Sequence, residues 1–456
     1  MTVTNEGWIR HLPPAIRERL HGRAQLQRIL SNIVWLSLDK VLRLILTAVI
    51  GIWVTRYLGP VQFGLLNYAA AFVALFTPLA TLGLDSIVIR DILGEDEEAR
   101  RTSLGTAFAM RTAGAAVGAV CAFLLVTVVR PGDSLAATLV VLAGVGMFAL
   151  AFDVIDLWFQ SQVKAKFAVY AKNGAFLIMS GVRVILLVVG APLVAFAWAV
   201  LAEALIGATA LLIVYRRKGQ HLRAWRVRLA RASQFLRDSW PLAFATLGTI
   251  LYMRIGQVML GNILSDREVG EYSVAVRLAE AWYFLPVAIT ASVFPSVLSA
   301  RRTDRVQYAR RMQVLYGGLS VISIAVAIPT SFLARTVVVL LFGPQYADAG
   351  PALAVYVWAS LPVFLGIASN QYLIAENRTR VALWRTVTGS VVNIILNMLL
   401  IPLWGILGAA VAALIAYSLA TFSFAVVPDL RSHVLLMVRS VNPRFLYAEM
   451  RKAAGT

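Results

Sequence analysis

Charged side chains inside apolar stretches are the residues of this 456-residue sequence that could do chemistry. Five of them are arginines, at Arg43, Arg111, Arg183, Arg254 and Arg277. An arginine at the centre of a membrane helix costs roughly 2.5–3.5 kcal/mol on insertion scales, so it usually faces a bundle interior or a wet cavity. The planar guanidinium forms paired hydrogen bonds with phosphate oxygens. These arginines therefore predict a cationic cavity for an anionic, phosphate-bearing substrate.

Carboxylates in the same stretches leave a second interpretation open. Asp39 and Arg43 share one helix face, as do Arg277 and Glu280, so each pair could simply lock helices together. Glu203 is a candidate partner for an arginine on another helix. Asp39, Glu203 and Glu280 are also candidates for binding a coupling proton or sodium ion, because an ion can shift a transport cycle only by binding one state better than the other.

Other charges lie closer to the predicted helix ends. Asp85, Asp153 and Asp156 can be solvated there or paired with arginines of the connecting segments. Lys40 can extend its long stem towards water. These positions need no role in a cavity.

One predicted span holds helix-breaking residues that a simple membrane anchor does not need. Pro78 removes a backbone hydrogen bond and permits a bend, and Pro286 stands in the matching span of the second half. Glycines at 59, 64 and 83 allow close helix approach. We expect Pro78 and Pro286 to mark gating helices and Asp85 to mark the cytoplasmic mouth.

Composition defines the class of protein that positions these residues. Hydrophobic residues make up 59% of the chain and charged residues 14%, whereas a soluble domain is roughly one quarter charged. The apolar residues fall in blocks of about 20, the length that crosses a bilayer. The single cysteine, Cys121, excludes an intramolecular disulfide and a cysteine-rich metal site. The sequence predicts an all-α polytopic membrane protein.

Twelve spans are predicted, and the connectors between them alternate in charge. Most of the 42 lysines and arginines lie in one set of connectors, which includes both termini. By the positive-inside rule this set, and with it both termini, is cytoplasmic. The net charge of +19 thus reflects topology and attraction to anionic lipids rather than nucleic-acid binding. The predicted spans are 29–57, 62–89, 103–129, 135–160, 172–190, 192–215, 240–264, 271–298, 312–333, 351–375, 386–402 and 404–427.

The spans divide into two halves of six. We predict a cytoplasmic basic arm (1–28), an N-terminal lobe (29–215), a basic inter-lobe loop (216–239), a C-terminal lobe (240–427) and a cytoplasmic tail (428–456). The stretch "RYLGPVQFGLLNYA" (56–69) aligns with "NILSDREVGEYSVA" (262–275), and Gly64 then falls on Gly270. Transporters built from parallel repeats place the substrate path between the halves.

The stretches "FGLLNYAAAFVALFTPLATLGLDSIVIRDI" (63–92) and "YMRIGQVMLGNILSDREVGEYSVAVRLAEAWYFLPVAITASVFPSVL" (252–298) resemble the Wzx-type polysaccharide flippases. These belong to the multidrug/oligosaccharidyl-lipid/polysaccharide (MOP) exporter superfamily. The resemblance covers essentially the whole chain. It departs at Gly256, where family members commonly carry Asp two residues after the arginine, and this leaves Arg254 without a neighbouring negative charge.

The resemblance implies a specific function. It implies an alternating-access transporter of the bacterial inner membrane that moves an undecaprenyl diphosphate-linked glycan to the outer leaflet. The partners implied are membrane lipids, a polysaccharide polymerase and a chain-length regulator. A peptidoglycan-precursor flippase or a drug exporter of the same superfamily remains the alternative, although a drug exporter would be expected to carry cavity acids.

An enzyme is not expected. The four histidines lie outside the spans, and no H-E-x-x-H, G-x-S-x-G or P-loop pattern occurs. We therefore expect no catalytic residues, no bound metal and no cofactor besides the coupling H⁺ or Na⁺.

Overall fold

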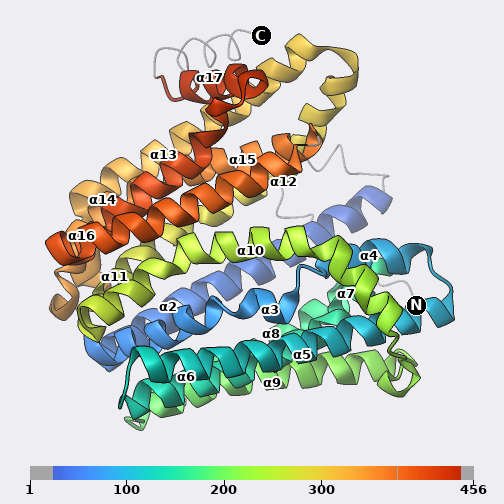
Figure 1. Ribbon diagram of the computed structural model, residues 1–456, viewed down its shortest axis with the longest axis horizontal. Coiled ribbons are helices and arrows are strands. Elements are labelled where there is room, and N and C mark those ends of the chain that lie inside the picture. Colours follow the sequence, from blue (N-terminus) through green and yellow to red (C-terminus); the bar gives the residue numbers. More distant parts are fainter. Residues whose placement is uncertain (1–23, 377, 443–456) are drawn as a thin grey trace. The chain divides into compact units, whose positions relative to one another are not determined.

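The computed structural model describes the backbone of residues 24–376 and 378–442 (Figure 1). All regular elements in these residues are helical, which confirms the predicted all-α class for this part of the chain. The chain forms two compact units, residues 1–54 and 55–456.

The helices of the first half begin with α2, which runs through both units. They are α2 (Ala24–Ala74), α3 (Thr77–Thr81), α4 (Asp85–Gly94), α5 (Glu97–Val129), α6 (Ser134–Gly146), α7 (Asp153–Ser161), α8 (Lys166–Val188) and α9 (Leu193–Arg217). Polar residues fix where several helices start. Asp96 caps α5 by accepting a bond from the Ala99 N–H at 2.8 Å, and Asp133 caps α6 through Ala136 at 2.9 Å.

The second half is joined to the first through α10. Its helices are α10 (Leu229–Ile263), α11 (Asp266–Glu280), α12 (Phe284–Thr303), α13 (Arg305–Phe342), α14 (Ala349–Tyr356), α15 (Ser360–Ala375), α16 (Thr379–Phe422) and α17 (Arg431–Arg439). Ser265 caps α11 and Asp304 caps α13 in the same way.

Ten helical segments of the described chain are long and apolar enough to cross a membrane, so the protein is a multi-pass membrane protein. Two of the ten contain a non-helical glycine, Gly59 in α2 and Gly405 in α16. Gly408 packs directly against the backbone of Leu400, which requires the chain to reverse at Gly405. Both glycines fall where the sequence predicts a boundary between spans. The number of crossings and the side of the termini stay predictions.

The second and fourth predicted spans are interrupted in both halves. In the first half, Leu82 and Gly83 are left-handed (φ 53° and 64°) and separate α3 from α4. Short 3₁₀ turns interrupt the other three spans, at Met147–Phe152, Ala281–Tyr283 and Val357–Ala359. Since irregular backbone within a membrane occurs where it is buried or lines a cavity, the repeated breaks support a twofold design.

The prolines do not bend a continuous helix as the sequence predicts. Pro78 lies in the first turn of α3, and Pro286 lies in the first turn of α12, after a 3₁₀ turn. A proline is tolerated there because the first backbone N–H groups of a helix have no partner within the helix. The interruptions lie beside the prolines, at residues 75–76, at residues 82–84 and in the turn Ala281–Tyr283.

Each half has its own hydrophobic core. The core of the first half runs from Leu84 to Phe235, and that of the second from Val297 to Met437. Residues that follow α9 belong to the first core: Trp225 packs against Phe108 and Tyr215, and its indole N–H donates to the Tyr215 hydroxyl at 3.0 Å. The segment between the halves is therefore anchored to the first half.

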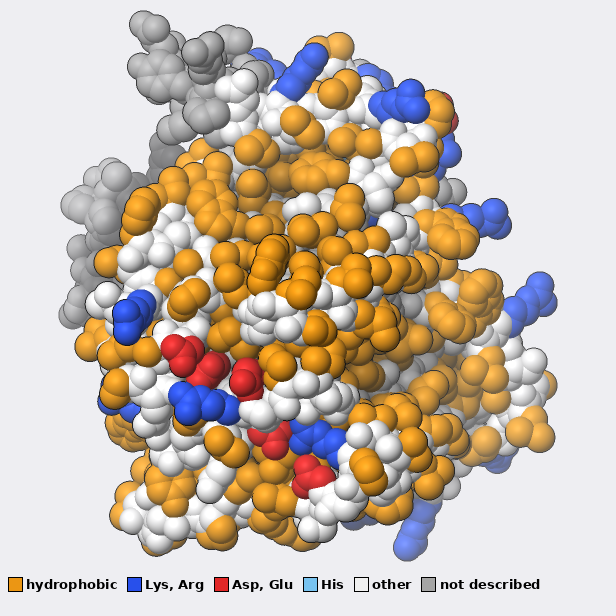
Figure 2. Space-filling model, turned by 60° about the vertical axis from the view of Figure 1, so that its left-hand side comes forward, with side chains coloured by type: hydrophobic (Ala, Val, Ile, Leu, Met, Phe, Trp, Pro, Cys, Tyr) orange, Lys and Arg blue, Asp and Glu red, His pale blue; other side chains and the backbone are white. Residues whose placement is uncertain are grey.

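The connectors meet in the pattern that their charges predict. The six weakly charged connectors are those that follow the odd-numbered predicted spans, and five of them take part in contacts with one another. The contacts are Tyr57 Oη with the Ala191 carbonyl (2.9 Å), Arg130 with Asp266 (2.8 Å) and the Gln345 amide with the Arg56 carbonyl (3.0 Å). Figure 2 shows a face dominated by hydrophobic side chains, with acidic side chains gathered in one small group beside basic ones.

Candidate functional site

The buried charge of the first half is Arg111 of α5. Its side chain is only 1% exposed, and its Nη2 donates to Asp85 Oδ1 of α4 at 2.7 Å. Asp85 itself is 62% exposed and can also reach water. The arginine therefore ties α5 to the start of α4, directly after the break at Gly83.

The other charges of this half are also paired between helices. Arg183 of α8 binds Glu203 of α9 at 2.6 Å, the partner that the sequence left open. Lys172 lies between Asp153 (2.9 Å) and Asp156 (2.7 Å). Both carboxylates predicted to be solvated or paired with arginines thus share a lysine, which the sequence reading did not consider.

Arg254 of α10 binds Glu280 of α11 at 3.3 Å. This corrects the expectation that Gly256 leaves Arg254 without a neighbouring negative charge, because the acid comes from the next helix. It also means that Glu280 is bound by Arg254 rather than by Arg277. Sequence spacing could not reveal this pair, since helix periodicity relates only positions three or four residues apart.

Tyrosines surround this ion pair. Tyr272, Tyr356 and Tyr417 are fully buried or nearly so, and the hydroxyls of Tyr356 and Tyr417 lie 3.1 Å apart. Tyr272 contacts Tyr356 edge to face. The second carboxylate oxygen of Glu280, Oε1, is buried and has no hydrogen-bond partner among the described residues. A proton or small cation could therefore bind to this oxygen.

Arg277 has a different environment. Its Nη1 lies 3.4 Å from the Thr55 hydroxyl, and its guanidinium lies 5.6 Å from the centre of the Phe63 ring. Arg183 of the first half is close enough for the two positive charges to repel. The side chain is exposed, and within the described residues it forms no ion pair, because Glu203 and Glu280 are bound by other arginines.

Arg385 is a second cation with neutral partners, and sequence reasoning missed it. Its Nη1 donates to Ser369 Oγ at 2.6 Å and its Nη2 to the Gly366 carbonyl at 3.4 Å. No ion pair of Arg385 occurs in the part of the chain that the structure describes. The sequence assigns it to a basic connector, one position before a predicted span, whereas α16 already begins at Thr379.

Three charged positions of the first predicted span lie apart from these sites. The side chain of Asp39 lies outside the described residues, and so does that of Lys40. Arg43 is exposed on α2, in the separate unit of residues 1–54.

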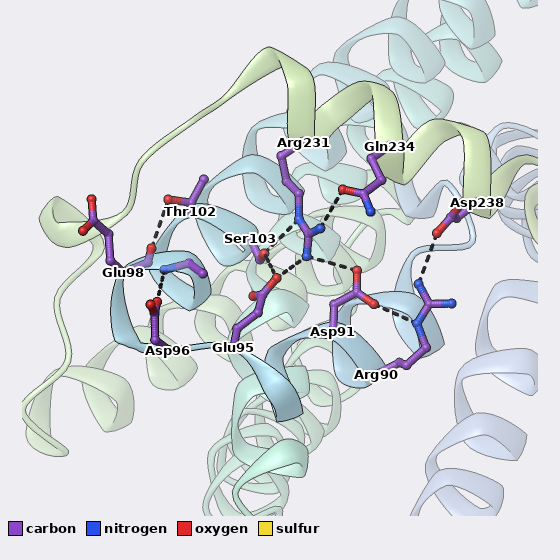
Figure 3. A network of polar contacts seen from close by, with 11 residues as sticks. Arg90, Asp91, Glu95, Asp96, Glu98, Thr102, Ser103, Arg231, Gln234 and Asp238 are labelled. Atoms are coloured by element: carbon purple, nitrogen blue, oxygen red, sulfur yellow. Dashed lines mark hydrogen bonds and ion pairs between the residues drawn. The ribbon is translucent and has the colours of Figure 1, made fainter.

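A polar network binds the start of α10 to the first half (Figure 3). Arg231 binds Asp91 at 3.0 Å, Ser103 at 3.1 Å and also Glu95. Arg90 bridges Asp91 (2.7 Å) and Asp238 (3.1 Å). Its hydrogen bond with Asp91 raises the pKa of the Arg90 guanidinium above its ordinary value. The network fixes α10 where the sequence predicts a loop.

Metal ligands do not gather anywhere in the described side chains: no group of three or more His, Cys, Asp or Glu residues could hold a metal ion.

A family model described as "Polysaccharide biosynthesis protein" matches residues 29–300. Two curated proteins of Haloferax volcanii are similar to parts of the chain. The "Probable flippase AglR" is 35% identical over 178 residues, which cover 37% of this chain and 36% of that protein. The "Probable low-salt glycan biosynthesis flippase Agl15" is 25% identical over 210 residues, which cover 45% of this chain and 42% of that protein. The chain thus aligns with less than half of the length of these relatives.

Solved structures show the same fold. An inward-facing multidrug resistance MATE family transporter of the MOP superfamily superposes with a TM-score of 0.66 at 16% identity, covering 88% of this chain and 96% of that one. The lipid II flippase MurJ, in an inward closed conformation, superposes with a TM-score of 0.69 at 14% identity, covering 90% of this chain and 91% of that one. The chain therefore has the fold of these transporters over about nine tenths of its length, which includes most of the residues that the family model does not reach.

Proposed function

Because this chain belongs to the polysaccharide biosynthesis protein family and has the MOP fold, we propose that it is a flippase for a lipid-linked oligosaccharide. The substrate we infer is a repeat unit on undecaprenyl diphosphate. It moves by alternating access from the cytoplasmic to the outer leaflet of the bacterial inner membrane. The product serves O-antigen, capsule or exopolysaccharide synthesis. The activity is transport rather than catalysis.

The observation that carries the proposal is the environment of Arg277. It stands in the second half, near the Arg183–Glu203 pair of the first half, and the Glu203 carboxylate binds Arg183 rather than Arg277. A diphosphate placed beside Arg277 would supply the missing negative charge. In a partly desolvated cavity that attraction is stronger than at a surface. A position between the halves also lets one anionic group contact both, as alternating access requires.

The decisive test replaces Arg277 with Ala and, separately, with Lys. We expect Arg277→Ala to abolish transport of the lipid-linked glycan in cells while the amount of inserted protein is unchanged. Arg277→Lys should restore only part of it, because lysine keeps the charge and loses the fork geometry. Arg385→Ala should weaken transport as well, if Arg385 also meets the diphosphate on its path.

The control is Arg431→Ala, which removes an exposed arginine at the start of α17, outside the spans. Full transport by Arg277→Ala, equal to that of the control, would contradict the proposal. A peptidoglycan precursor carries the same diphosphate, so proteoliposomes should be tested with both lipids. Movement of the peptidoglycan precursor alone would reassign the substrate to the alternative named above.

Further partners follow from the pathway proposed. A flipped repeat unit must be consumed in the outer leaflet, which calls for a polymerase and a chain-length regulator. Glu280 is our candidate for a coupling site for H⁺ or Na⁺, since Oε1 of its carboxylate is buried and has no hydrogen-bond partner within the described part of the chain. Glu203 then serves as a counter-charge to Arg183.

A further inference from the structure

The two glycines that the internal repeat aligns, Gly64 and Gly270, pack against backbone across the junction of the halves. A Cβ built on Gly64 would overlap the Asp266 carbonyl oxygen and lie 2.8 Å from the Gly270 nitrogen. A Cβ built on Gly270 would overlap the carbonyl of Pro60. Neither glycine has a positive φ, so the requirement here is space and not backbone conformation.

Arg130 lies beside these glycines and binds across the same junction. It ends α5 in the first half and is 11% exposed. Its Nη1 binds Asp266 at 2.8 Å and its Nη2 donates to the Gly261 carbonyl, both in the second half. The guanidinium also lies 3.8 Å from the centre of the Tyr68 ring. One side chain thus joins three helices of both halves.

The partners of Arg130 are themselves held in place. Tyr68 donates its hydroxyl to Asn262 Oδ1 at 2.9 Å, which binds the end of α2 to the end of α10. Asp133, which caps α6, lies 3.4 Å from Arg130 and orients it from its own half. A charge-assisted bond combined with a cation–π contact is stronger than an exposed ion pair.

We propose that Gly64, Gly270 and Arg130 form a latch that holds the halves closed at the end where the weakly charged connectors meet. The inference rests on the proposed function, because a glycan released on that side must pass between the halves. The closed state depends on direct backbone contact, which cannot adapt by side-chain movement. When the halves part, Arg130 loses Asp266 and Gly261 but keeps Asp133. Opening the latch therefore does not leave the Arg130 guanidinium without a carboxylate.

The test measures the separation of the halves directly. In a Cys121→Ser background, spin labels at Val61→Cys and Leu264→Cys report the distance across the latch, at two exposed side chains. In the unmutated protein we expect a short distance in most molecules and a longer one in the small open fraction. Gly270→Ala and Gly64→Ala should move most molecules to a longer distance. Arg130→Ala should raise the open fraction about tenfold, equivalent to about 1.4 kcal/mol.

Matched controls come from glycines with free space around them. Gly181→Ala in α8 and Gly318→Ala in α13 add the same methyl group where nothing lies within 4 Å, and both should keep the short distance. If a glycine variant fails to insert, Arg130→Gln and Asp266→Asn carry the test. An unchanged short distance in all latch variants would overturn the proposal. The distance can be measured without glycan. If the latch variants show the longer distance and the unmutated protein moves no glycan, the proposed substrate is refuted and the latch is not.

Discussion

The two halves of the molecule treat charge within the membrane differently. In the first half, Arg111, Arg183 and Lys172 each contact at least one carboxylate. In the second half Arg254 also binds a carboxylate, while the described contacts of Arg277 and Arg385 are with neutral groups. A cation with neutral partners costs free energy until an anion arrives. Under the proposed function, this difference gives the charges of the first half a structural role and Arg277 and Arg385 a role in substrate binding.

The largest effect is expected where a fully buried charge loses its partner. Asp85→Asn would leave the Arg111 guanidinium buried without a carboxylate, and since Asp85 is 62% exposed we expect a cost at the lower end of the about 3–5 kcal/mol that breaking a fully buried pair costs. Thermal unfolding in detergent should therefore show a strongly lowered midpoint. Asp348→Asn is the control, since its carboxylate is 74% exposed and lies 3.9 Å from Arg267. Equal shifts in the two variants would show that the Arg111 pair has no special structural role.

A smaller, pH-dependent effect is expected in the second half, outside the spans. His433 of α17 is buried, stacks on Tyr372 and lies 2.7 Å from the Tyr316 hydroxyl. Burial lowers the pKa of His433 to about 3, whereas an unfolded histidine titrates near about 6.5. Between these values the unfolded chain binds the proton and the folded one does not. The contribution of neutral His433 to the free energy of unfolding is therefore fully present above about pH 6.5 and is lost as the pH falls towards 3.

At pH 5 the free energy of unfolding should be about 2 kcal/mol lower than at pH 7 because of this histidine. Unfolding measured at both pH values should show it, and His433→Gln should reduce the pH dependence. His221→Gln, which changes an exposed histidine, should leave that dependence unaltered. A pH profile that His433→Gln does not flatten would show that the neutral form of this residue does not stabilise the fold.

The smallest effect concerns the two glutamates. If Glu280 binds the coupling ion, Glu280→Gln should slow flipping in proteoliposomes about tenfold, or about 1.4 kcal/mol in barrier, and remove its response to a pH or Na⁺ gradient. Glu203→Gln should retain that response, because Glu203 serves Arg183. No response of the unmutated protein to either gradient would make the transporter a facilitator driven by downstream polymerisation.

Much of the fold could be predicted because it follows from one-dimensional patterns. The alternation of charged and uncharged connectors anticipates which connectors meet, and the chain leaves the helical conformation at Gly59 and Gly405, where predicted spans end. The alignment of Gly64 with Gly270 identified related positions. It did not predict that they touch, since a repeat defines symmetry and not the distance between its copies.

The partners of the charges could not be predicted. Arg111 pairs with Asp85 and Arg254 with Glu280 from different helices, and helix packing is not encoded in local spacing. Arg385 was missed because the edge of a hydrophobic block places a helix end only to within a few residues. The break beside Pro78 depends on Leu82, a residue with no intrinsic preference for positive φ, so the surrounding structure imposes it.

The anchoring of Trp225 and Phe235 to the first core also has a consequence for biosynthesis. The first half cannot complete its core when its sixth span leaves the ribosome, because these two side chains follow that span in the chain. Its core closes only after the start of α10 has been synthesised. The first half of the nascent chain is therefore still incompletely folded when synthesis of the second half begins. A translational pause once Phe235 has emerged from the ribosome would give the first half time to close, whereas a pause when the chain has emerged only as far as Lys218 would not.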